Sequence, residues 1–540
     1  MDRSKSFPFL HHHENGSGDN KGDCPSESLF SGDCTIDFLR DPCAFFNSRA
    51  VKLNSAVFSC RFLLKTTTFV GSNRGVAEIL SSEKASDFEM GYKGYLSSIF
   101  GDILIFTSGP DATVRRQCLK DILNSSNAAS LVDSQIRSVV QEFFNTLDVS
   151  NLVSLYDMFK RLGTQLMISL FLGLDVKKEA ETLERLSQLI VTHWHGIKAI
   201  PVNIKFSVFS STFNKSLEAR EQMIEITRQR LSQIQEDENS IYESLPDSQV
   251  DYQSFSITPQ QSKSVPQVAR GCPYSEQCST SKCHVSYPTP TLAGDYQSKC
   301  SDGSVQGPRS DVNYESLAAE EQLSDCTANS NLLAAFCRAK FPTEQSRIDD
   351  LFLFVTGLGP KAITSVMTSF VIQVWKSASW DDTGEMQLLD SRGELRAETF
   401  DSALWEVLRL WPPFVGGRRF ATKPTTIDGY NIPEGRPVVF HTLAAHRDPS
   451  VFESPLVFKP SRWRKAENGI CPERNLFMFG GGARDCIGRQ LMLRMFKEIL
   501  TQFYAKWNCA LIDLQEPVQY KFLPVSRPKQ KPMGKLTPKK

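Results

Sequence analysis

The chain has no excess of charge of either sign. Its 540 residues include 61 basic and 61 acidic side chains, so the formal net charge at pH 7 is zero. Proteins that bind nucleic acid through its phosphates normally carry a strongly basic surface. The charge balance therefore gives no electrostatic reason to expect a nucleic-acid partner.

A long apolar run is missing from the N-terminal region. The first 33 residues are rich in Ser, Gly, Asp and Asn, and their acidic residues are atypical of a mitochondrial transit peptide. The 14 cysteines also lack the regular spacing of a disulfide framework. We therefore expect an intracellular protein in a reducing compartment, cytoplasmic or peripherally associated with a membrane, without a signal peptide or an N-terminal membrane anchor.

One cysteine lies in a glycine-rich loop, FGGGARDCIG, at residues 479–488. Apolar residues at four-residue spacing follow it and predict an amphipathic helix: Ile487, Leu491, Met495, Ile499 and Phe503. Cys486 is thus predicted at a helix N-terminus, where free N–H groups and the helix dipole favour the thiolate, and Arg484 adds a positive charge. The glycines allow sharp turns and the close approach of a flat ligand. The loop predicts a thiolate ligand for a metal.

The spacing of Phe479, Gly482, Arg484, Cys486 and Gly488 matches the pattern F-x-x-G-x-R-x-C-x-G and resembles the haem-binding loop of the cytochromes P-450. The resemblance implies that heme b, an iron protoporphyrin IX, is the cofactor and that Cys486 is the axial ligand of its iron. It implies cofactor-binding roles for the other four residues. It also implies the fold class: mainly α with small β-sheets (α+β), in a single large domain.

A second set of residues supports the resemblance. Glu406 and Arg409 lie three residues apart on a predicted helix, as in the family's E-x-x-R helix. Residues 458–463, FKPSRW, resemble the F-x-P-x-R-W segment whose arginine, here Arg462, completes a Glu-Arg-Arg network. Buried charges persist only when they are paired. The role implied for Glu406, Arg409 and Arg462 is therefore structural, in holding the segment that carries the cysteine loop.

Three arginines are candidates for binding the haem propionates: Arg116, Arg419 and Arg484. The resemblance places an arginine near each of these positions, although the usual Trp or His partner of Arg116 is Ala112 here. A planar guanidinium suits bidentate binding of a carboxylate. The alternative for Arg116 and Arg419 is an ordinary surface salt bridge, which contributes little.

Residues 351–375 contain one charge in 25 positions and are apolar enough to be mistaken for a membrane span. Gly357, Gly359, Pro360 and Lys361 interrupt the middle of the segment, and no strongly basic flank follows it. In the resembled family this segment is the central helix that crosses the core over the haem. We therefore predict a buried core helix.

The central helix departs from the family pattern. Oxygen-activating members carry an acid followed by threonine, a pair that delivers protons during oxygen activation; here the two positions are Gly359 and Pro360. Proton delivery could take another form. Because Pro360 lacks an N–H, the carbonyl of Thr356 would lose its helical partner. This carbonyl could then hold a water relay near Gly357, together with the hydroxyls of Thr356 and Thr364. Alternatively, the protein rearranges or dehydrates (hydro)peroxides without a reductase, or it binds haem with little catalysis.

We favour a monooxygenase that acts on a small apolar substrate. The cysteine loop lacks the insertion found in plant peroxide-rearranging members, and residues 192–206 and 412–435 look most like the retinoid- and sterol-oxidising branch. Such an enzyme inserts one oxygen atom from dioxygen. Its electrons come from a separate reductase or ferredoxin, because the chain has no flavin or nicotinamide motif. We expect a monomer.

The composition divides the chain into segments. The stretch 237–325 is rich in Ser, Gln, Asp, Thr and Pro and has few aliphatic residues, so it cannot bury enough apolar surface to offset its ordering entropy. We predict a disordered arm at 1–34, the two parts of one P-450 domain at 35–236 and 326–525, a disordered insertion at 237–325, and a solvated basic tail at 526–540. A weak attraction of this tail to anionic membranes is the less favoured alternative. Within the first part we expect a helix at 36–49 and strands at 56–63 and 65–70.

Overall fold

The computed structural model describes residues 21–27, 32–124, 126–197, 211–243, 332–377, 388–464 and 470–539. The chain forms two units, Met1–Glu238 with Asn329–Lys540, and Asn239–Ala328. The predicted insertion at 237–325 falls almost entirely outside the described residues. Only its first positions are described, and there the helix α9 (Thr212–Glu243) continues past the predicted boundary.

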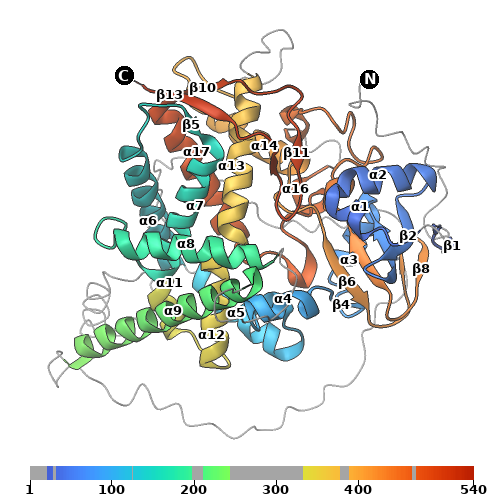
Figure 1. Ribbon diagram of the computed structural model, residues 1–540, viewed down its shortest axis with the longest axis horizontal. Helices are drawn as coiled ribbons and strands as arrows, with labels where there is room; N and C mark the ends of the chain where they lie inside the picture. Colours follow the sequence, from blue (N-terminus) through green and yellow to red (C-terminus); the bar gives the residue numbers. More distant parts are fainter. Residues whose placement is uncertain are drawn as a thin grey trace, which may run out of the picture. The chain divides into compact units, whose positions relative to one another are not determined.

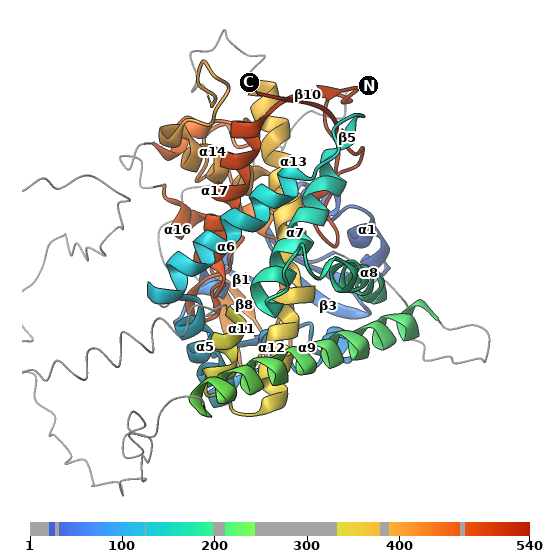
Figure 2. The same ribbon diagram turned by 90° about the vertical axis from the view of Figure 1, so that its left-hand side faces the viewer.

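Helices form most of the first unit. The side chains of α7 (Leu155–Leu172) are buried on nearly every side, as expected for a helix that is apolar around most of its circumference. It packs along α13 (Leu358–Ser377), which runs through the middle of the helical part in both views (Figure 1, Figure 2). The helices α14 (Ala397–Leu410) and α17 (Arg489–Lys506) pack on α13 as well. The mainly helical class is confirmed.

Other helices of this unit surround the central ones. They are α1 (Thr35–Arg40), α2 (Pro42–Lys52), α3 (Asn73–Leu80), α4 (Lys93–Phe100), α5 (Gly109–Asn124), α6 (Ser126–Asn145), α8 (Ala180–Gly196), α11 (Leu332–Arg338), α12 (Glu344–Thr356), α15 (Thr442–Ala445) and α16 (Pro472–Asn475). The helix expected at 36–49 is divided into α1 and α2 at Asp41. The Asp41 carboxylate accepts hydrogen bonds from the N–H groups of Cys43 and Ala44, at 3.1 and 3.0 Å, and so caps α2.

The largest sheet has five strands in the order β2-β3-β9-β6-β4. Their bounds are Val57–Phe62, Lys65–Val70, Pro437–Phe440, Gly417–Ala421 and Phe88–Met90. Neighbouring strands are antiparallel except β3 and β9, which are parallel. The two strands expected at 56–63 and 65–70 are confirmed as β2 and β3. The sheet positions Arg419, which lies on β6.

The prediction of a disordered arm at 1–34 is wrong for the described residues 21–27 and 32–34. The strand β1 (Gly22–Asp23) pairs in parallel with β8 (Tyr430–Ile432), which also pairs with β7 (Thr425–Ile427). Ser26 forms a bridge with Ser59, and Glu27 accepts a hydrogen bond of 3.0 Å from the guanidinium of Arg49. Exposed strand edges offer free backbone groups that even a polar segment can pair with, and composition alone does not reveal such pairing.

The prediction of a solvated tail at 526–540 is also wrong. The strand β13 (Met533–Pro538) pairs with β10 (Trp507–Ile512) and β5 (Val153–Ser154), and β12 (Arg527–Pro528) pairs with β11 (Tyr520–Lys521). Leu536 is buried between the exposed residues Lys535 and Thr537. This alternation is typical of a strand with one buried face. The many lysines of the segment concealed it.

The central helix is broken into two parts. The first, α12, ends at Thr356, Gly357 has a φ of −80° and a ψ of −130°, and α13 begins at the next residue. The stretch Glu344–Lys376 is long and apolar enough to cross a membrane, but 72% of its most apolar window is buried inside the protein. The burial supports the prediction of a core helix.

The buried face of β13 can be tested by truncating one side chain. Replacing Leu536 by Ala should lower the free energy of unfolding by about 2–3 kcal/mol, because the side chain leaves a cavity in the core. Lys535→Ala, on the exposed face of the same strand, should change it by less than about 0.5 kcal/mol. Urea denaturation followed by circular dichroism measures both values, and equal, negligible effects would mean that the segment is a free tail.

Candidate functional site

The cysteine loop has the geometry expected of a ligand loop that leads into a helix. The N–H of Cys486 donates to the carbonyl of Phe479 at 2.7 Å, and a short 3-10 helix, Gly482–Arg484, lies between them. The helix α17 begins at Arg489, with Gly488 as its N-cap. The N–H of Gly488 donates to the sulfur of Cys486. The sulfur therefore lies at the N-terminus of α17, as predicted.

The expectation of a low-pKa thiol is wrong for the chain by itself. Burial raises the pKa of Cys486, and the carboxylate of Asp485 raises it further, against the opposing effects of the Gly488 N–H, Arg116 and Arg489. Desolvation outweighs the helix terminus because a bare thiolate is poorly solvated there. A bound metal cation reverses this balance, since it deprotonates a coordinating thiol. The site suits a sulfur that becomes anionic on metal binding.

The glycines of the loop serve different purposes. Gly482 has a φ of +59°, and a Cβ there would lie 2.4 Å from the carbonyl oxygen of Leu80 and 2.7 Å from the nitrogen of Ser82. It therefore allows the loop to pack against the end of α3. A Cβ on Gly488 would meet only Phe354, at 4.0 Å. Open space thus lies beside Gly488 and close to Cys486, which fits the approach of a flat ligand.

Arg419 and Arg484 lie close together without an acidic partner among the described residues. Arg419 is 9% exposed, and burial, reinforced by repulsion from Arg484, lowers its pKa to about 10. The guanidinium of Arg484 donates to the hydroxyl of Ser108 at 3.0 Å and to the carbonyl of Thr107 at 3.4 Å. A buried cation next to a partly buried one, without a counterion, favours an anionic ligand. The two propionates of haem supply that charge, so these residues fit the cofactor.

Arg116 differs from the other two arginines. Its guanidinium donates to the carboxylate of Asp485 at 2.6 Å and to the carbonyl of the same residue at 2.7 Å. It therefore fastens α5 to the residue that precedes Cys486. Because its charge is already balanced by a carboxylate, the geometry does not support the propionate-binding role expected for Arg116.

Glu406, Arg409 and Arg462 come together in one buried network. Arg409 makes a bidentate pair with Glu406, at 2.9 and 2.8 Å, and both side chains are 0% exposed. Arg462 donates to Glu406 at 3.0 Å. The indole of Trp463 and the N–H of Lys459 also donate to this carboxylate, each at 2.9 Å. Trp463 was part of the recognised FKPSRW segment, but its hydrogen bond was not foreseen.

The network reaches the cysteine loop through a histidine that sequence reasoning missed. Arg409 donates to the carbonyl of His446 at 2.9 Å, and the Nε2 atom of His446 accepts from the N–H of Phe477 at 2.7 Å. Burial lowers the pKa of His446 to about 3, so the ring is neutral and can accept. Phe477 stands two residues before Phe479. No local pattern around His446 indicates this contact.

A second buried ion pair was also missed. Arg115 makes a bidentate pair with Asp350, with distances of 2.9 and 2.7 Å, and the two side chains are 1% and 0% exposed. Asp350 also accepts from the N–H of Leu104 at 2.8 Å. The pair joins α5, α12 and the loop before Thr107. The available signal was two adjacent acids, Asp349 and Asp350, at the start of an apolar helix.

The central helix does not provide the proposed proton relay. Pro360 does free the carbonyl of Thr356, but the indole N–H of Trp194 donates to it. The hydroxyls of Thr356 and Thr364 donate to the carbonyls of Phe352 and Pro360, both at 2.8 Å. The protons of both hydroxyls are therefore occupied within the helices, and the role of Gly357 is to break the helix.

A cavity of about 390 Å³ lies elsewhere in the fold. Its lining includes Trp375, Tyr504 and Trp507. Tyr504 is near the end of α17 and Cys486 precedes its start, and an α-helix rises 1.5 Å per residue, so the cavity is roughly 25 Å from the sulfur. It is therefore separate from the cysteine loop. The sequence predicts that 100–107, 192–215 and 351–364 line the substrate pocket, and of these 198–210 lie outside the described residues.

Comparisons with known proteins agree with this geometry. Residues 377–533 match the family model described as Cytochrome P-450. A putative cytochrome P-450 120 from Synechocystis sp. is 28% identical over 216 residues, 38% of this chain and 48% of that protein. The sequence match thus spans about half the length of this curated relative.

Solved structures extend the likeness to the whole fold. Retinoic acid-bound cyanobacterial CYP120A1 superposes with a TM-score of 0.66 at 18% identity, over 96% of this chain and 99% of that one. A cytochrome P-450EX alpha with myristic acid gives a TM-score of 0.61 at 15% identity, over 95% and 99%. The fold and the cysteine loop define a haem-thiolate protein. The chain belongs to the cytochrome P-450 superfamily, and its cofactor is heme b.

The unpaired charge of Arg419 leads to a specific prediction. Arg419→Leu should speed the loss of haem to a scavenging apoprotein by about 10- to 100-fold, because a charge-assisted hydrogen bond is worth about 1.5–3 kcal/mol. The haem-free protein should be no less stable, since the substitution removes an unpaired buried cation. Arg436→Leu, at a partly exposed position, is the control. Unchanged haem loss in Arg419→Leu would rule out the propionate contact.

The carboxylate of Glu406 can be neutralised without changing its shape. Glu406→Gln should lower the free energy of unfolding by about 3–5 kcal/mol, since two guanidinium groups lose their buried counterion. Glu453→Gln is a matched control, because Glu453 is 85% exposed and lies 4.0 Å from Lys459; its effect should stay below about 1 kcal/mol. Similar values for the two variants in urea denaturation would contradict a structural role for the network.

Proposed function

We propose that this protein is a haem-thiolate monooxygenase, an oxidoreductase that acts on paired donors. It inserts one oxygen atom from dioxygen into a small apolar substrate, a lipid, retinoid, sterol or terpenoid-like molecule. Electrons come from a separate reductase or ferredoxin. We further propose that it acts as a monomer inside the cell, in the cytoplasm or at a membrane surface.

The observation that carries this proposal is the combination of Cys486 at the N-terminus of α17 with Arg419 and Arg484, two neighbouring cations without an acidic partner among the described residues. The thiolate of Cys486 would hold the haem iron and the two arginines would hold its carboxylates, and the bound haem would supply the oxygen-activating chemistry. Gly488 donates its N–H to the sulfur and so stabilises the charge on it. Relatives named cucurbitadienol 11-hydroxylase and beta-amyrin 28-monooxygenase support an apolar substrate.

A second candidate is a haem-thiolate enzyme that rearranges or dehydrates (hydro)peroxides without a reductase. The central helix favours it, because residues 351–377 contain no acid and the hydroxyls of Thr356 and Thr364 are occupied. A chemistry that needs no delivered proton tolerates these changes. A haem protein with little catalysis is the third reading.

One experiment distinguishes the three candidate functions. The haem-loaded protein is incubated with retinoic acid, a sterol and a polyunsaturated fatty acid in the presence of a P-450 reductase, NADPH and dioxygen, and separately with a fatty-acid hydroperoxide alone. Oxygenated products that require NADPH support the monooxygenase. Turnover of the hydroperoxide without NADPH supports the second candidate, and no product in either arm supports the third.

Restoring the acid and the alcohol tests the importance of their absence. The double variant Gly359→Glu/Pro360→Thr should increase NADPH-driven product formation by about tenfold or more, since general-acid groups typically contribute 10²- to 10⁴-fold. Room can be made, because a Cβ on Gly359 would meet the flexible end of Met167 at 2.7 Å.

Pro360→Ala is the control, because it restores a backbone N–H without adding a proton donor. An equal increase in this control would assign the effect to the helix break. No increase in the double variant would mean that proton delivery in the natural chain takes another route.

A further inference from the structure

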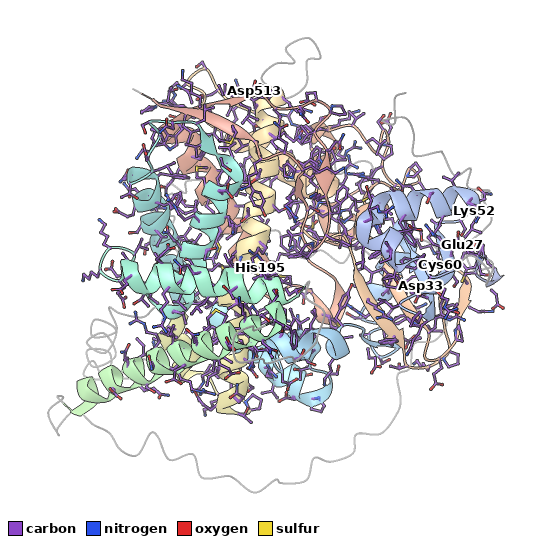
Figure 3. All side chains as sticks on the ribbon, in the orientation of Figure 1. Glu27, Asp33, Lys52, Cys60, His195 and Asp513 are labelled. Atoms are coloured by element: carbon purple, nitrogen blue, oxygen red, sulfur yellow. The ribbon has the colours of Figure 1, made fainter. Side chains whose placement is uncertain are left out.

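Two buried thiols face each other far from the cysteine loop. Cys34 precedes α1 and Cys60 lies on β2; their sulfur atoms are 3.0 Å apart, and the residues are 4% and 3% exposed. The N–H of Cys34 donates to the carbonyl of Arg61 at 2.8 Å, which holds the two segments together. Figure 3 labels Cys60 and Asp33 in this region, and Asp33 accepts from the N–H of Leu64 at 2.7 Å.

We propose that Cys34 and Cys60 are a redox modification site, at which hydrogen peroxide forms a reversible disulfide. A disulfide has an S–S distance of about 2.05 Å, so the sulfurs need to approach by about 1 Å. Each segment is anchored by its backbone hydrogen bonds, and the adjustment is within the reach of side-chain rotation. None of the residues assigned to the haem site contacts the pair.

A cation next to the pair favours thiolate formation. The hydrogen bond between the two sulfurs and their burial have the largest effects on the pKa values of both thiols, and the charge of Arg49 favours the thiolate of each. Because the thiolate is the form that reacts, either sulfur can attack the oxidant, and the other then acts as the resolving thiol.

The reaction balances with hydrogen peroxide as the oxidant. With Cys34 written as the attacking thiol, its thiolate attacks one peroxide oxygen, the O–O bond breaks, and the departing hydroxide takes up a proton to become water, which leaves a sulfenic acid. The sulfur of Cys60 then attacks the sulfur of Cys34, the S–O bond breaks, and the hydroxyl leaves with the Cys60 proton as a second water. Two thiols and one peroxide thus give a disulfide and two water molecules. An external thiol reductant reduces the disulfide again by thiol–disulfide exchange.

The bond would fix the N-terminal arm to the main sheet. The described part of this arm, 21–27 and 32–34, is held by β1, by the Ser26–Ser59 bridge and by the pair between Glu27 and Arg49. Local opening of a segment that is held by few interactions gives a small oxidant access to buried thiols. A covalent link across the segment 34–60 removes that opening and stabilises the arm.

Peptide mapping of the haem-loaded protein tests the bond. The protein is treated with hydrogen peroxide, free thiols are alkylated, and the trypsin digest is analysed without reduction. Trypsin releases residues 22–40, with Cys24 and Cys34, separately from residues 53–61, with Cys60. We expect these two peptides to be linked, with loss of two hydrogens, and to separate again after treatment with dithiothreitol.

Single-cysteine variants show which two cysteines form the disulfide. Cys24 is the nearest competitor, with its sulfur 2.9 Å from the hydroxyl of Ser59, so the link should persist in Cys24→Ser and disappear in Cys34→Ser and Cys60→Ser. Cys43→Ser, on α2, is a further control that should keep the link. The oxidised natural protein should also unfold a few degrees higher than the reduced one, a shift absent from Cys60→Ser.

Three outcomes would overturn the proposal. They are a folded, haem-loaded natural protein that gives no linked peptide at excess peroxide, a link that is lost in Cys24→Ser, and a link that forms only after unfolding in urea. If Cys34→Ser fails to fold, loss of the link in Cys60→Ser and its persistence in Cys24→Ser still identify the bonded pair.

Discussion

The buried carboxylate of Glu406 is the interaction on which the site depends most widely. It balances Arg409 and Arg462 inside the protein, and it also accepts from Trp463 and from the backbone of Lys459. Removing its charge would leave two guanidinium groups without a counterion, a far larger cost than the loss of an exposed pair. Through Arg409 and His446 the same network reaches the N–H of Phe477, just before the cysteine loop. A charge on α14 therefore helps to hold the start of this loop.

A second constraint acts on the chemistry. Pro360 and Gly357 break the central helix, and the indole of Trp194 occupies the carbonyl that the proline leaves free. The threonine hydroxyls are bonded within the helices, so the chain has the ligand set of a haem-thiolate enzyme without the usual means of delivering protons from this helix. The two functions that we propose, one oxygen-dependent and one peroxide-dependent, differ in their need for protons from this helix, and the thiolate loop is compatible with both.

Local patterns in the sequence predicted the parts of the fold and site that depend on neighbouring residues. The residues within the cysteine loop, within the helix behind it and within the pair Glu406–Arg409 are each only a few positions apart, and so these patterns could be recognised. The contacts of Asp485 with Arg116 and of Asp350 with Arg115 join positions hundreds of residues apart, and no spacing rule reveals them. The strands β1 and β13 were missed for a different reason. Their polar or basic composition is typical of free ends, and only the availability of a strand edge makes them pair.

Cys486 is the residue that defines this protein as a haem-thiolate protein, through its role as the ligand of the haem iron. The most direct test is the carbon monoxide difference spectrum of the reduced protein, compared among the natural chain, Cys486→Ser and Cys471→Ser, whose thiol is on the segment before the loop. The natural chain and Cys471→Ser should both show the red-shifted Soret band of a thiolate-ligated haem, and Cys486→Ser should lose it while retaining bound haem. A natural chain without the band, or a Cys486→Ser variant that keeps it, would contradict the assignment.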